Sequence, residues 1–465
     1  MAARLVLVLW LLFAAVPATA QSFAPAEIAR VDGIVATALA RSGIPSASVA
    51  VVRDGRIAFT RAYGRQSPDV PVARADARYP IASVSKQFVA AALLMLEDEG
   101  RLSLDDPVAK YLPTVTAGDR TTIRQLLAHS SGITDYWPQD YAFAEMARPI
   151  TPNEILRRWA SRPPDFAPGT DFRYSNTGYV AAGLIAEKVA GVPLMTLLKR
   201  RIFDPLGLTP VDLDNAVGPG FPVPARRFAL GPVRAETPAA RGWLYAAGGL
   251  AMSAGDLARW NIARLDRALL PAEDWIAQET PQPLSGGRAA NYGLGVVIGQ
   301  RHGERTVEHS GEAVGFLSQN IVVPKRRIAV TVLVNGAFGA AQDEIADAVL
   351  AMLLAPAPPP GDEGRLADAR ALFDQLRQGR ADPAQLTGHL RAFFTPQALG
   401  DYRDSLGPLG EPATLTLARP SALRGGFVQR VYVLTYPDGR RLMIGTFAEP
   451  GAHGRWEQFL VTPGS

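Results

Sequence analysis

The spacing of hydrophobic residues along the chain switches several times between a helical and a strand-like period. Residues 25–42 repeat apolar side chains at helical spacing behind a leading proline, which predicts a helix. Two β-rich runs follow at 47–53 and 56–63, and the Asp54-Gly55 pair between them is typical of a tight hairpin. Residues 83–99 are almost continuously apolar, which predicts a helix buried on nearly every side.

The middle of the chain, from 105 to about 284, is a series of short helical patterns separated by proline and glycine. Strand-like runs and one helix then close the region. The strands are expected at 292–299, 306–308, 316–323 and 328–335, and the helix at 340–354. This order predicts an α/β (α+β) fold, in which the two ends of the segment form an antiparallel sheet, helices flank it and a helical insertion separates its halves.

A proline-rich stretch at 355–361 has the composition of a linker. Beyond it we expect helices at 362–378 and 383–394, and strands at 413–418, 427–435, 441–447 and 456–461. The chain is therefore predicted to hold two domains, 24–354 and 362–465, the second a small α+β accessory domain. Nothing in the sequence of this second domain indicates its partner.

Residues 1–20 have the pattern of a cleaved export signal: Arg4, an apolar run from Leu5 to Val16, and the small residues Ala18-Thr19-Ala20. The run is shorter than the roughly 20 apolar residues that span a bilayer, so we expect no membrane span. The mature chain would begin near Gln21 and work in the periplasm or outside the cell.

Composition excludes several classes of function. Hydrophobic residues make up 48% of the chain, enough for a large core, and there is no cysteine, so packing replaces disulfides. The 48 basic and 44 acidic residues are intermixed and leave a net charge of +4, which argues against a nucleic-acid-binding stripe. The five histidines form no zinc-type cluster, and we expect neither a metal nor another cofactor.

The segment Ser83-Val84-Ser85-Lys86 opens the apolar helix and places Ser83 and Lys86 on one face. A serine is a weak nucleophile until a base removes its proton, and a lysine in a water-poor pocket can lose its charge and act as that base. The alternative is an N-capping serine beside a solvated lysine.

Two further segments carry suitable chemistry. In Tyr174-Ser175-Asn176, the tyrosine can pass protons and the asparagine amide can bind a substrate amide, although a loop with an Asx turn has the same residues. In His309-Ser310-Gly311, the glycine would let a substrate backbone approach a strand edge, although His309 alone could be structural.

In this order, on helix, loop and strand, the three segments resemble the serine β-lactamase and D,D-peptidase (penicillin-recognising) superfamily, in particular its class C β-lactamase-like hydrolases. The resemblance covers roughly residues 25–355. It includes the segments YPIA before Ser83, LSLDDPVAKYLP, TIRQLLAHSSGITDY, AGGL, GEAVGFLSQNIVVP and VTVLVNG.

The resemblance implies a β-lactamase/transpeptidase-like fold and a role for each motif residue. Ser83 would be the acylated nucleophile and Lys86 its activating partner, while Tyr174 would act with Lys86 as general base and then as acid to the leaving group. Asn176 would hold the substrate's acyl-side amide. His309, Ser310, Gly311 and Glu312 would line the binding site, with the N–H groups of Ser83 and Glu312 as the oxyanion hole.

Two departures shape the expected substrate. His309 stands where class C β-lactamases usually have lysine, and no Glu can be assigned as the deacylating base of class A enzymes. We therefore expect a hydrolase that forms an acyl-enzyme and cleaves D-amino-acid peptides, such as cell-wall fragments, or esters. The alternatives are β-lactamase activity, a non-catalytic penicillin-binding sensor, and a lytic enzyme whose C-terminal module binds the cell wall.

Two neighbouring positions are less specific. His129 could be interpreted as the base of a Ser-His-Asp triad. The resemblance places its loop beside the cleft but does not make this histidine the base, so we expect His129 to be structural. Tyr136 and Trp137 are equally well interpreted as an aromatic rim that selects substrate and as packing residues.

Overall fold

The computed structural model describes residues 22–139, 142–354, 365–419, 421–451 and 453–464. The predicted export signal and the predicted linker lie outside these residues. The chain divides into two compact units, Met1–Leu353 and Leu354–Ser465. Each is described by itself.

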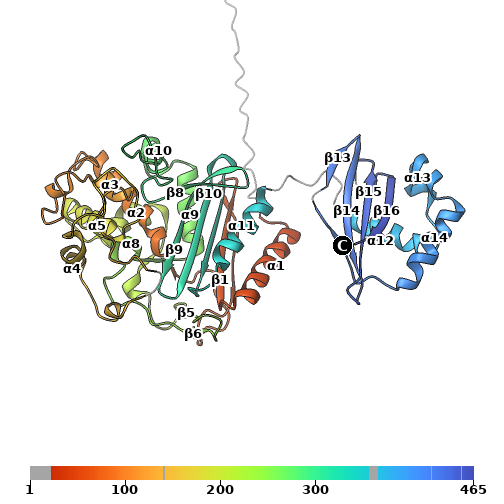
Figure 1. The fold of residues 1–465 in the computed structure, drawn as a ribbon, viewed down its shortest axis with the longest axis horizontal. Coiled ribbons are helices and arrows are strands. Elements are labelled where there is room, and N and C mark those ends of the chain that lie inside the picture. Colours follow the sequence, from red (N-terminus) through yellow and green to blue (C-terminus); the bar gives the residue numbers. More distant parts are fainter. Residues whose placement is uncertain (1–21, 140–141, 355–364, 420, 452, 465) are drawn as a thin grey trace, which may run out of the picture. The chain divides into compact units, whose positions relative to one another are not determined.

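The first unit is built on a six-stranded antiparallel sheet in the order β2-β1-β11-β10-β9-β8 (Figure 1). Its strands are β1 Ser46–Arg53, β2 Arg56–Gly64, β8 Val297–Arg301, β9 Glu304–Ala313, β10 Phe316–Val323 and β11 Ile328–Val334. The first two strands come from the beginning of the unit and the other four from its end, as the sequence pattern predicts. The mixed fold with an antiparallel sheet is thereby confirmed.

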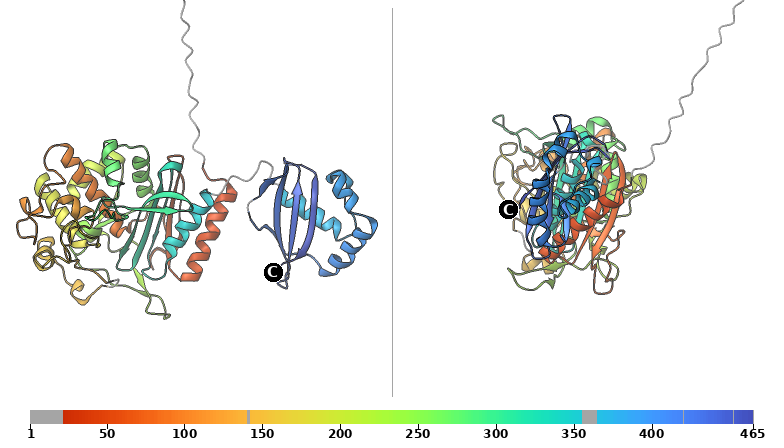
Figure 2. Two further views of the ribbon diagram at one scale, coloured as in Figure 1. Left: turned by 45° about the horizontal axis from the view of Figure 1, so that its top comes forward. Right: turned by 90° about the vertical axis from the view of Figure 1, so that its right-hand side faces the viewer.

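Helices cover both faces of this sheet. On one face lie the first and last helices of the unit, α1 (Pro25–Ser42) and α11 (Ala341–Leu354), as both ribbon views show (Figures 1 and 2). On the other face α9 (Ala254–Leu265) packs against β1 and β11, and beyond it lies α2 (Lys86–Asp98) with the insertion.

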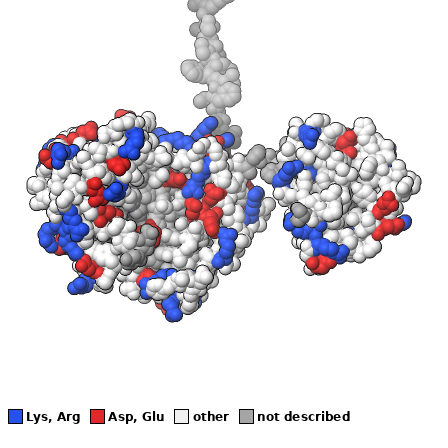
Figure 3. All heavy atoms as spheres, in the orientation of Figure 1, with Lys and Arg blue, Asp and Glu red and all other residues white. Residues whose placement is uncertain are grey.

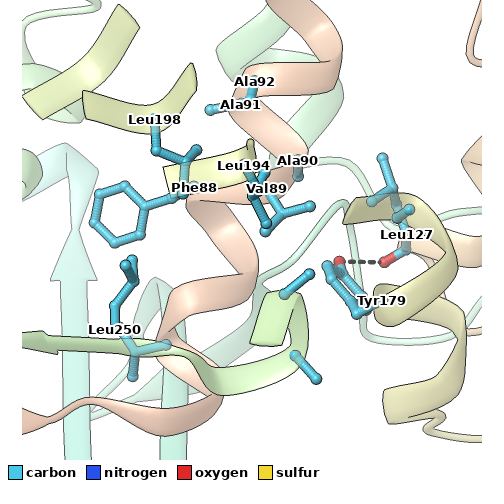
Figure 4. Close-up of a cluster of buried hydrophobic side chains, with 14 of the residues drawn as sticks. Phe88, Val89, Ala90, Ala91, Ala92, Leu127, Tyr179, Leu194, Leu198 and Leu250 are labelled. Carbon is cyan, nitrogen blue, oxygen red and sulfur yellow. Dashed lines mark hydrogen bonds between the residues drawn. The ribbon is translucent and has the colours of Figure 1, made fainter. Parts of the chain in front are cut away.

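The insertion consists of short elements. Its helices are α3 Ile123–Leu127, α4 Pro152–Ile155, α5 Asn176–Ala190, α6 Leu194–Leu198, α7 Asp204–Leu206, α8 Tyr245–Gly248 and α10 Ala272–Gln278. Its small strands are β3 Tyr79–Pro80, β4 Val211–Asp212, β5 Ala225–Arg226, β6 Arg234–Ala235 and β7 Leu250–Met252. Every residue of α2 from Lys86 to Leu96 is buried, because neighbouring helices surround it (Figure 4).

Three predicted elements near the motifs differ from the structure. The helix expected at 83–99 begins as a tight 3₁₀ turn, Ala82–Ser85, before α2 starts. The strand expected at 292–299 is only β8, because Gly295 has a positive φ of 79° and turns the chain against the backbone of Gln87. The short strand expected at 306–308 extends to Ala313, so the third motif lies within β9.

The second unit is a twisted antiparallel sheet with three helices against one of its faces (Figure 2). Its strands are β12 Thr414–Leu417, β13 Ala422–Arg424, β14 Phe427–Thr435, β15 Arg441–Ala448 and β16 Trp456–Pro463, and its helices are α12 Arg365–Leu376, α13 Gly388–Phe393 and α14 Pro396–Leu406. The helix expected at 383–394 is a 3₁₀ turn, Pro383–Gln385, followed by α13. The sequence analysis missed α14 and β13. The unit has its own core, centred on Phe373, Tyr432 and Trp456.

Basic and acidic side chains alternate over the visible surface of both units, without a single-sign stripe on that face (Figure 3). Among the described helices, none taken alone has both the length and the apolar composition to cross a membrane. One bent pair, Asn176–Ala190 with Leu194–Leu206, has them in combination.

Candidate active site

The turn Ala82–Ser85 brings Ser83 and Lys86 together. Residues three apart are eclipsed in a 3₁₀ turn, and the Ser83 Oγ lies 3.0 Å from the Lys86 Nζ. Ala82 has a φ of 48°, a strained value for a residue with a side chain. The turn therefore holds Ser83 at the start of a helix with its side chain directed at the lysine.

Lys86 is completely buried, and its other contacts fix where its protons point. The Nζ donates to the carbonyl oxygen of Ala247 at 2.6 Å and to the Asn176 Oδ1 at 2.9 Å. These oxygens can only accept, so a neutral amine directs its two protons to them and its lone pair to Ser83. Burial lowers the pKa of Lys86 to about 7, while the charge of Asp135 acts in the opposite direction. A base is thus present near neutral pH.

Tyr174 lies on the other side of the amine. The Lys86 Nζ is 4.8 Å from the centre of its ring. Its hydroxyl is buried and makes no hydrogen bond of ordinary geometry to the described residues. Burial raises the pKa of Tyr174, and the neighbouring Ser83 hydroxyl counteracts this effect. A protonated hydroxyl beside nucleophile and base can relay a proton between them.

Asp135 orients Asn176, a contact that the sequence analysis did not anticipate. The Asp135 Oδ1 accepts from the backbone N–H of Asn176 at 2.9 Å, and its Oδ2 accepts from the Nδ2 at 3.2 Å. The amide oxygen therefore points to Lys86, and a second N–H of the Nδ2 remains for a substrate. Burial raises the pKa of the Asp135 carboxyl. The N–H groups of Trp137 and Asn176, which donate to it, lower this pKa in part.

His309 is buried, and its two ring nitrogens are engaged by neighbours. The Nδ1 lies 2.6 Å from the carbonyl oxygen of Ser310, and the Nε2 lies 2.8 Å from the hydroxyl of Tyr292. Because the carbonyl can only accept, the proton belongs on Nδ1, and Tyr292 donates to Nε2. Burial and the nearby Lys86 lower the pKa of His309 to about 4. His309 is therefore neutral near pH 7.

Gly311 is the point at which β9 touches the nucleophile turn. A Cβ there would lie 2.2 Å from the carbonyl oxygen of Ile81 and 2.2 Å from the Ser318 Oγ. The physical reason for this glycine is thus the close approach of strand and turn, which the sequence analysis had attributed to the substrate backbone.

Strand β9 also has a free edge in this region. It pairs with β10 from Val307 to Ala313, but β8 pairs with it only up to Glu308. No strand of the described chain pairs with residues 309–313 on that side. Ser310 and Glu312 are exposed, while His309, Gly311 and Ala313 are buried. This edge can bind an extended substrate by backbone hydrogen bonds.

These residues border a cleft of about 750 Å³. Seven of the eight residues expected from the motifs lie in its lining or directly beneath it. Its lining includes Ser83, Tyr174, Asn176, His309, Ser310 and Glu312, with Asp135, Tyr136, Trp137, Asp165, Phe172, Arg173 and Tyr292 among the others, and Lys86 lies beneath Ser83. Gly311 lies behind the lining, against the turn.

The aromatic residues 136 and 137 have different roles. Tyr136 is buried and its hydroxyl donates to the carbonyl oxygen of Trp243, so most of its side chain is packing. Trp137 is half-buried in the cleft wall. The rim interpretation therefore applies to Trp137.

His129 is enclosed by aromatic rings, with its ring centre 4.1 Å from that of Tyr174. Its Nδ1 accepts from the backbone N–H of Ser175 at 3.1 Å, and burial lowers its pKa well below the ordinary value. It has no hydrogen bond to Ser83, in keeping with a structural role. Among the described residues, no group of three or more His, Asp or Glu side chains could hold a metal ion.

Comparison of the chain with known proteins identifies its family. The family model described as Beta-lactamase matches residues 31–354, most of the chain. The chain belongs to the beta-lactamase family. It is 30% identical over 319 residues to a D-aminopeptidase of Brucella anthropi, which covers 64% of this chain and 57% of that protein. The chain thus spans less than two thirds of the length of this curated relative.

Solved structures agree with the fold. A D-stereospecific amidohydrolase from Streptomyces sp. has a TM-score of 0.60 and 29% identity, covering 70% of this chain and 98% of its own. An octameric penicillin-binding protein homologue from Pyrococcus abyssi has a TM-score of 0.61 and 21% identity and covers 93% of this chain and 99% of its own. The second match shares its fold with most of this chain, including part of the C-terminal unit.

Proposed function

We propose that this beta-lactamase family member is an exported serine hydrolase that cleaves amide bonds of D-amino-acid compounds through an acyl-enzyme on Ser83. The observation that carries the proposal is the buried Lys86 amine, 3.0 Å from the Ser83 Oγ and with a pKa lowered to about 7. A lysine in this state serves as a base toward the adjacent hydroxyl at neutral pH.

The reaction follows from the positions of these groups. Lys86 takes the proton of the Ser83 hydroxyl as the Oγ bonds to the substrate carbonyl carbon. The oxygen of that carbonyl gains negative charge, which the N–H groups of Ser83 and Glu312 would stabilise. Tyr174 gives its proton to the leaving nitrogen as the C–N bond breaks and takes the proton held by Lys86, so both groups return to their neutral forms. Lys86 then takes a proton from a water molecule as the water oxygen bonds to the ester carbon, and it passes this proton to the Ser83 Oγ as the acid is released.

The charge of the cleft favours a substrate that carries an amino group. The cleft lining contains the carboxylates Asp135, Asp165 and Glu312 and the guanidinium of Arg173. The lining thus carries three carboxylates against one guanidinium, and that guanidinium of Arg173 forms an ion pair with Asp165 at 3.2 Å. A free α-ammonium group is attracted by such a cleft, which suits the names of the D-aminopeptidase and D-stereospecific amidohydrolase relatives.

His309 gives no support to strong recognition of a substrate carboxylate, because it is neutral near pH 7. Export rests on the sequence pattern of residues 1–20.

A labelling experiment tests the proposal. A fluorophosphonate should label the purified protein, and mass spectrometry should locate the adduct on Ser83. Ser83→Ala should abolish labelling, whereas the control Ser131→Ala, a buried serine outside the cleft lining, should retain it. An adduct on Ser131 or Ser310 would contradict the assignment.

Turnover separates the remaining alternatives. D-amino-acid amides, D-peptides and short esters, each with the L-isomer as control, should show hydrolysis that Ser83→Ala abolishes. A fluorescent penicillin that acylates Ser83 without any turnover of these substrates would favour the sensor, and rapid β-lactam hydrolysis would favour a β-lactamase.

A further inference from the structure

A second cavity, of about 400 Å³, lies behind the nucleophile turn. Its volume falls within the range of roughly 300–1,000 Å³ typical of sites for small molecules. One wall is aliphatic and comes from α2, α5, α6 and β7. Val89, Leu194, Leu198 and Leu250, four of its side chains, lie around α2 in Figure 4. This wall would accept a hydrophobic body.

The cavity lining carries more acidic than basic groups. Its charged side chains are Glu187, Asp212, Asp214 and Arg241. The three carboxylates accept hydrogen bonds from the backbone N–H groups of Leu194, Asp214 and Gly242, respectively. None of the three forms an ion pair within the described part of the chain.

A buried hydroxyl in the same cavity lacks a partner. Ser85 borders the cavity and is only 2% exposed, and its buried Oγ forms no hydrogen bond with the described residues. An unsatisfied buried hydroxyl is unfavourable, and a ligand that supplies a donor or an acceptor removes this cost. The Ser85 hydroxyl and the carboxylates are independent signs that a polar ligand group fits here.

The cavity shares its walls with the catalytic machinery. Ser85 lies between Ser83 and Lys86 on one turn. The short helix α8 separates the two spaces: Ala246 borders this cavity, while the next residue, Ala247, borders the cleft and accepts the hydrogen bond of Lys86. Tyr245, at the start of α8, has a strained φ of 26° and also borders the cavity.

We propose that this cavity binds a small primary amine with a hydrophobic body, and that its occupancy alters the reactivity of Ser83. The ammonium group would lie between the carboxylates and Ser85, and the body against α2 and α6. A ligand there contacts Ser85 and Ala246, the residues that precede Lys86 and its acceptor Ala247, and thereby displaces the base relative to the nucleophile. Only the effect on reactivity rests on the proposed function, because binding is measurable without catalysis.

Binding is tested with 4-fluorobenzylamine by ¹⁹F NMR on the full-length protein. Met195→Trp, which fills the cavity from α6, should abolish binding, and Asp214→Asn should weaken it at least about five-fold. Asp165→Asn, a carboxylate of the catalytic cleft, is the matched control and should leave it unchanged. 4-Fluorobenzyl alcohol, which lacks the charge, should bind at least about ten-fold more weakly.

Several results would overturn the site. The first is that the probe does not bind at about 10 mM. The second is that only Asp165→Asn reduces binding, and the third is that the amine and the alcohol bind equally. Asp214→Asn keeps the test decisive if Met195→Trp does not fold.

The coupling is tested by the rate of fluorophosphonate labelling of Ser83 with and without the amine. We expect a change of about five-fold or more that disappears in Asp214→Asn. A change that persists in this variant would indicate competition in the cleft and would overturn the coupling, as would binding without any change in rate. A protein that binds the amine but is never labelled would refute the proposed function and leave the binding site supported.

Discussion

At the scale of single residues, the site depends on the charge of one lysine. Lys86 has no solvent contact, two carbonyl-type acceptors and one carboxylate, Asp135, close enough to influence it. Burial favours the neutral amine, and the carboxylate favours the ammonium. The balance places the pKa of Lys86 near the pH at which the protein would work.

This balance predicts how activity depends on pH. The rate of Ser83 acylation should rise with pH through about 7, as Lys86 loses its proton. Asp135→Asn removes the charge that raises the pKa of Lys86, so the midpoint should move to lower pH in an acylation-rate profile. Asp165→Asn, whose carboxylate is paired with Arg173, should leave the midpoint in place.

An Asp135→Asn midpoint that stays or moves upward would contradict this account. His309 offers a second check. Its pKa is about 4, so His309→Gln should not remove the limb near pH 7. Loss of that limb would assign it to the histidine instead.

Local spacing alone pairs Ser83 with Lys86, whereas Tyr174, Asn176 and His309 were joined to them only through the family resemblance. Ser83 and Lys86 are three positions apart, so local geometry brings them together whatever the rest of the fold does. The contacts of Asp135 with Asn176 and of Tyr292 with His309 span 41 and 17 residues. A single sequence does not show which residues that far apart along the chain come into contact. For the same reason, the neutral state of His309 follows only from the surroundings that the fold supplies.

At the scale of elements, the free edge of β9 is the feature that the fold contributes to binding. The edge begins where β8 stops pairing, at Glu308, and continues to Ala313. The sequence analysis predicted β10 with its observed bounds, because its apolar residues are bounded by a glycine and a proline turn. It placed a strand too early at 292, because Tyr292 and Leu294 are buried in a turn and not in the sheet.

The edge predicts a specific effect of proline. Glu312→Pro removes the backbone N–H expected to stabilise the oxyanion, and acylation should slow by about 10²–10³-fold. Glu312→Ala keeps that N–H and should retain most of the activity with a neutral ester. Stopped-flow acylation of both variants, with circular dichroism as a check of folding, makes the comparison. Equal rates in the two variants would remove the Glu312 N–H from the oxyanion hole.

At the scale of the whole molecule, the two units have separate cores. The catalytic residues all lie in the first unit, and the core around Phe373, Tyr432 and Trp456 belongs entirely to the second. The proline-rich composition at 355–361 marked this division in the sequence. The composition could not reveal how α13 and α14 of the second unit are joined. A Thr-Pro pair follows the end of α13, and its threonine caps the start of α14.

Separate cores predict that the first unit folds alone. A chain ending at Leu354 should be soluble and cooperative in thermal unfolding, and should acylate at Ser83 within about three-fold of the full-length rate. Melting curves and labelling rates of the two proteins provide the test. A truncated protein that is insoluble, or folded but unreactive, would show that the second unit completes the first.

The free edge of β9 also bears on association between protein molecules. An unpaired strand edge is a template to which another sheet can add, which is a common route to aggregation. Here the open stretch is short, from His309 to Ala313, and it borders a cleft whose walls include Trp137 and Phe172. Such a short stretch offers few backbone groups with which the edge of another sheet could pair. The shortness of the open stretch thus limits edge-to-edge pairing with another protein molecule.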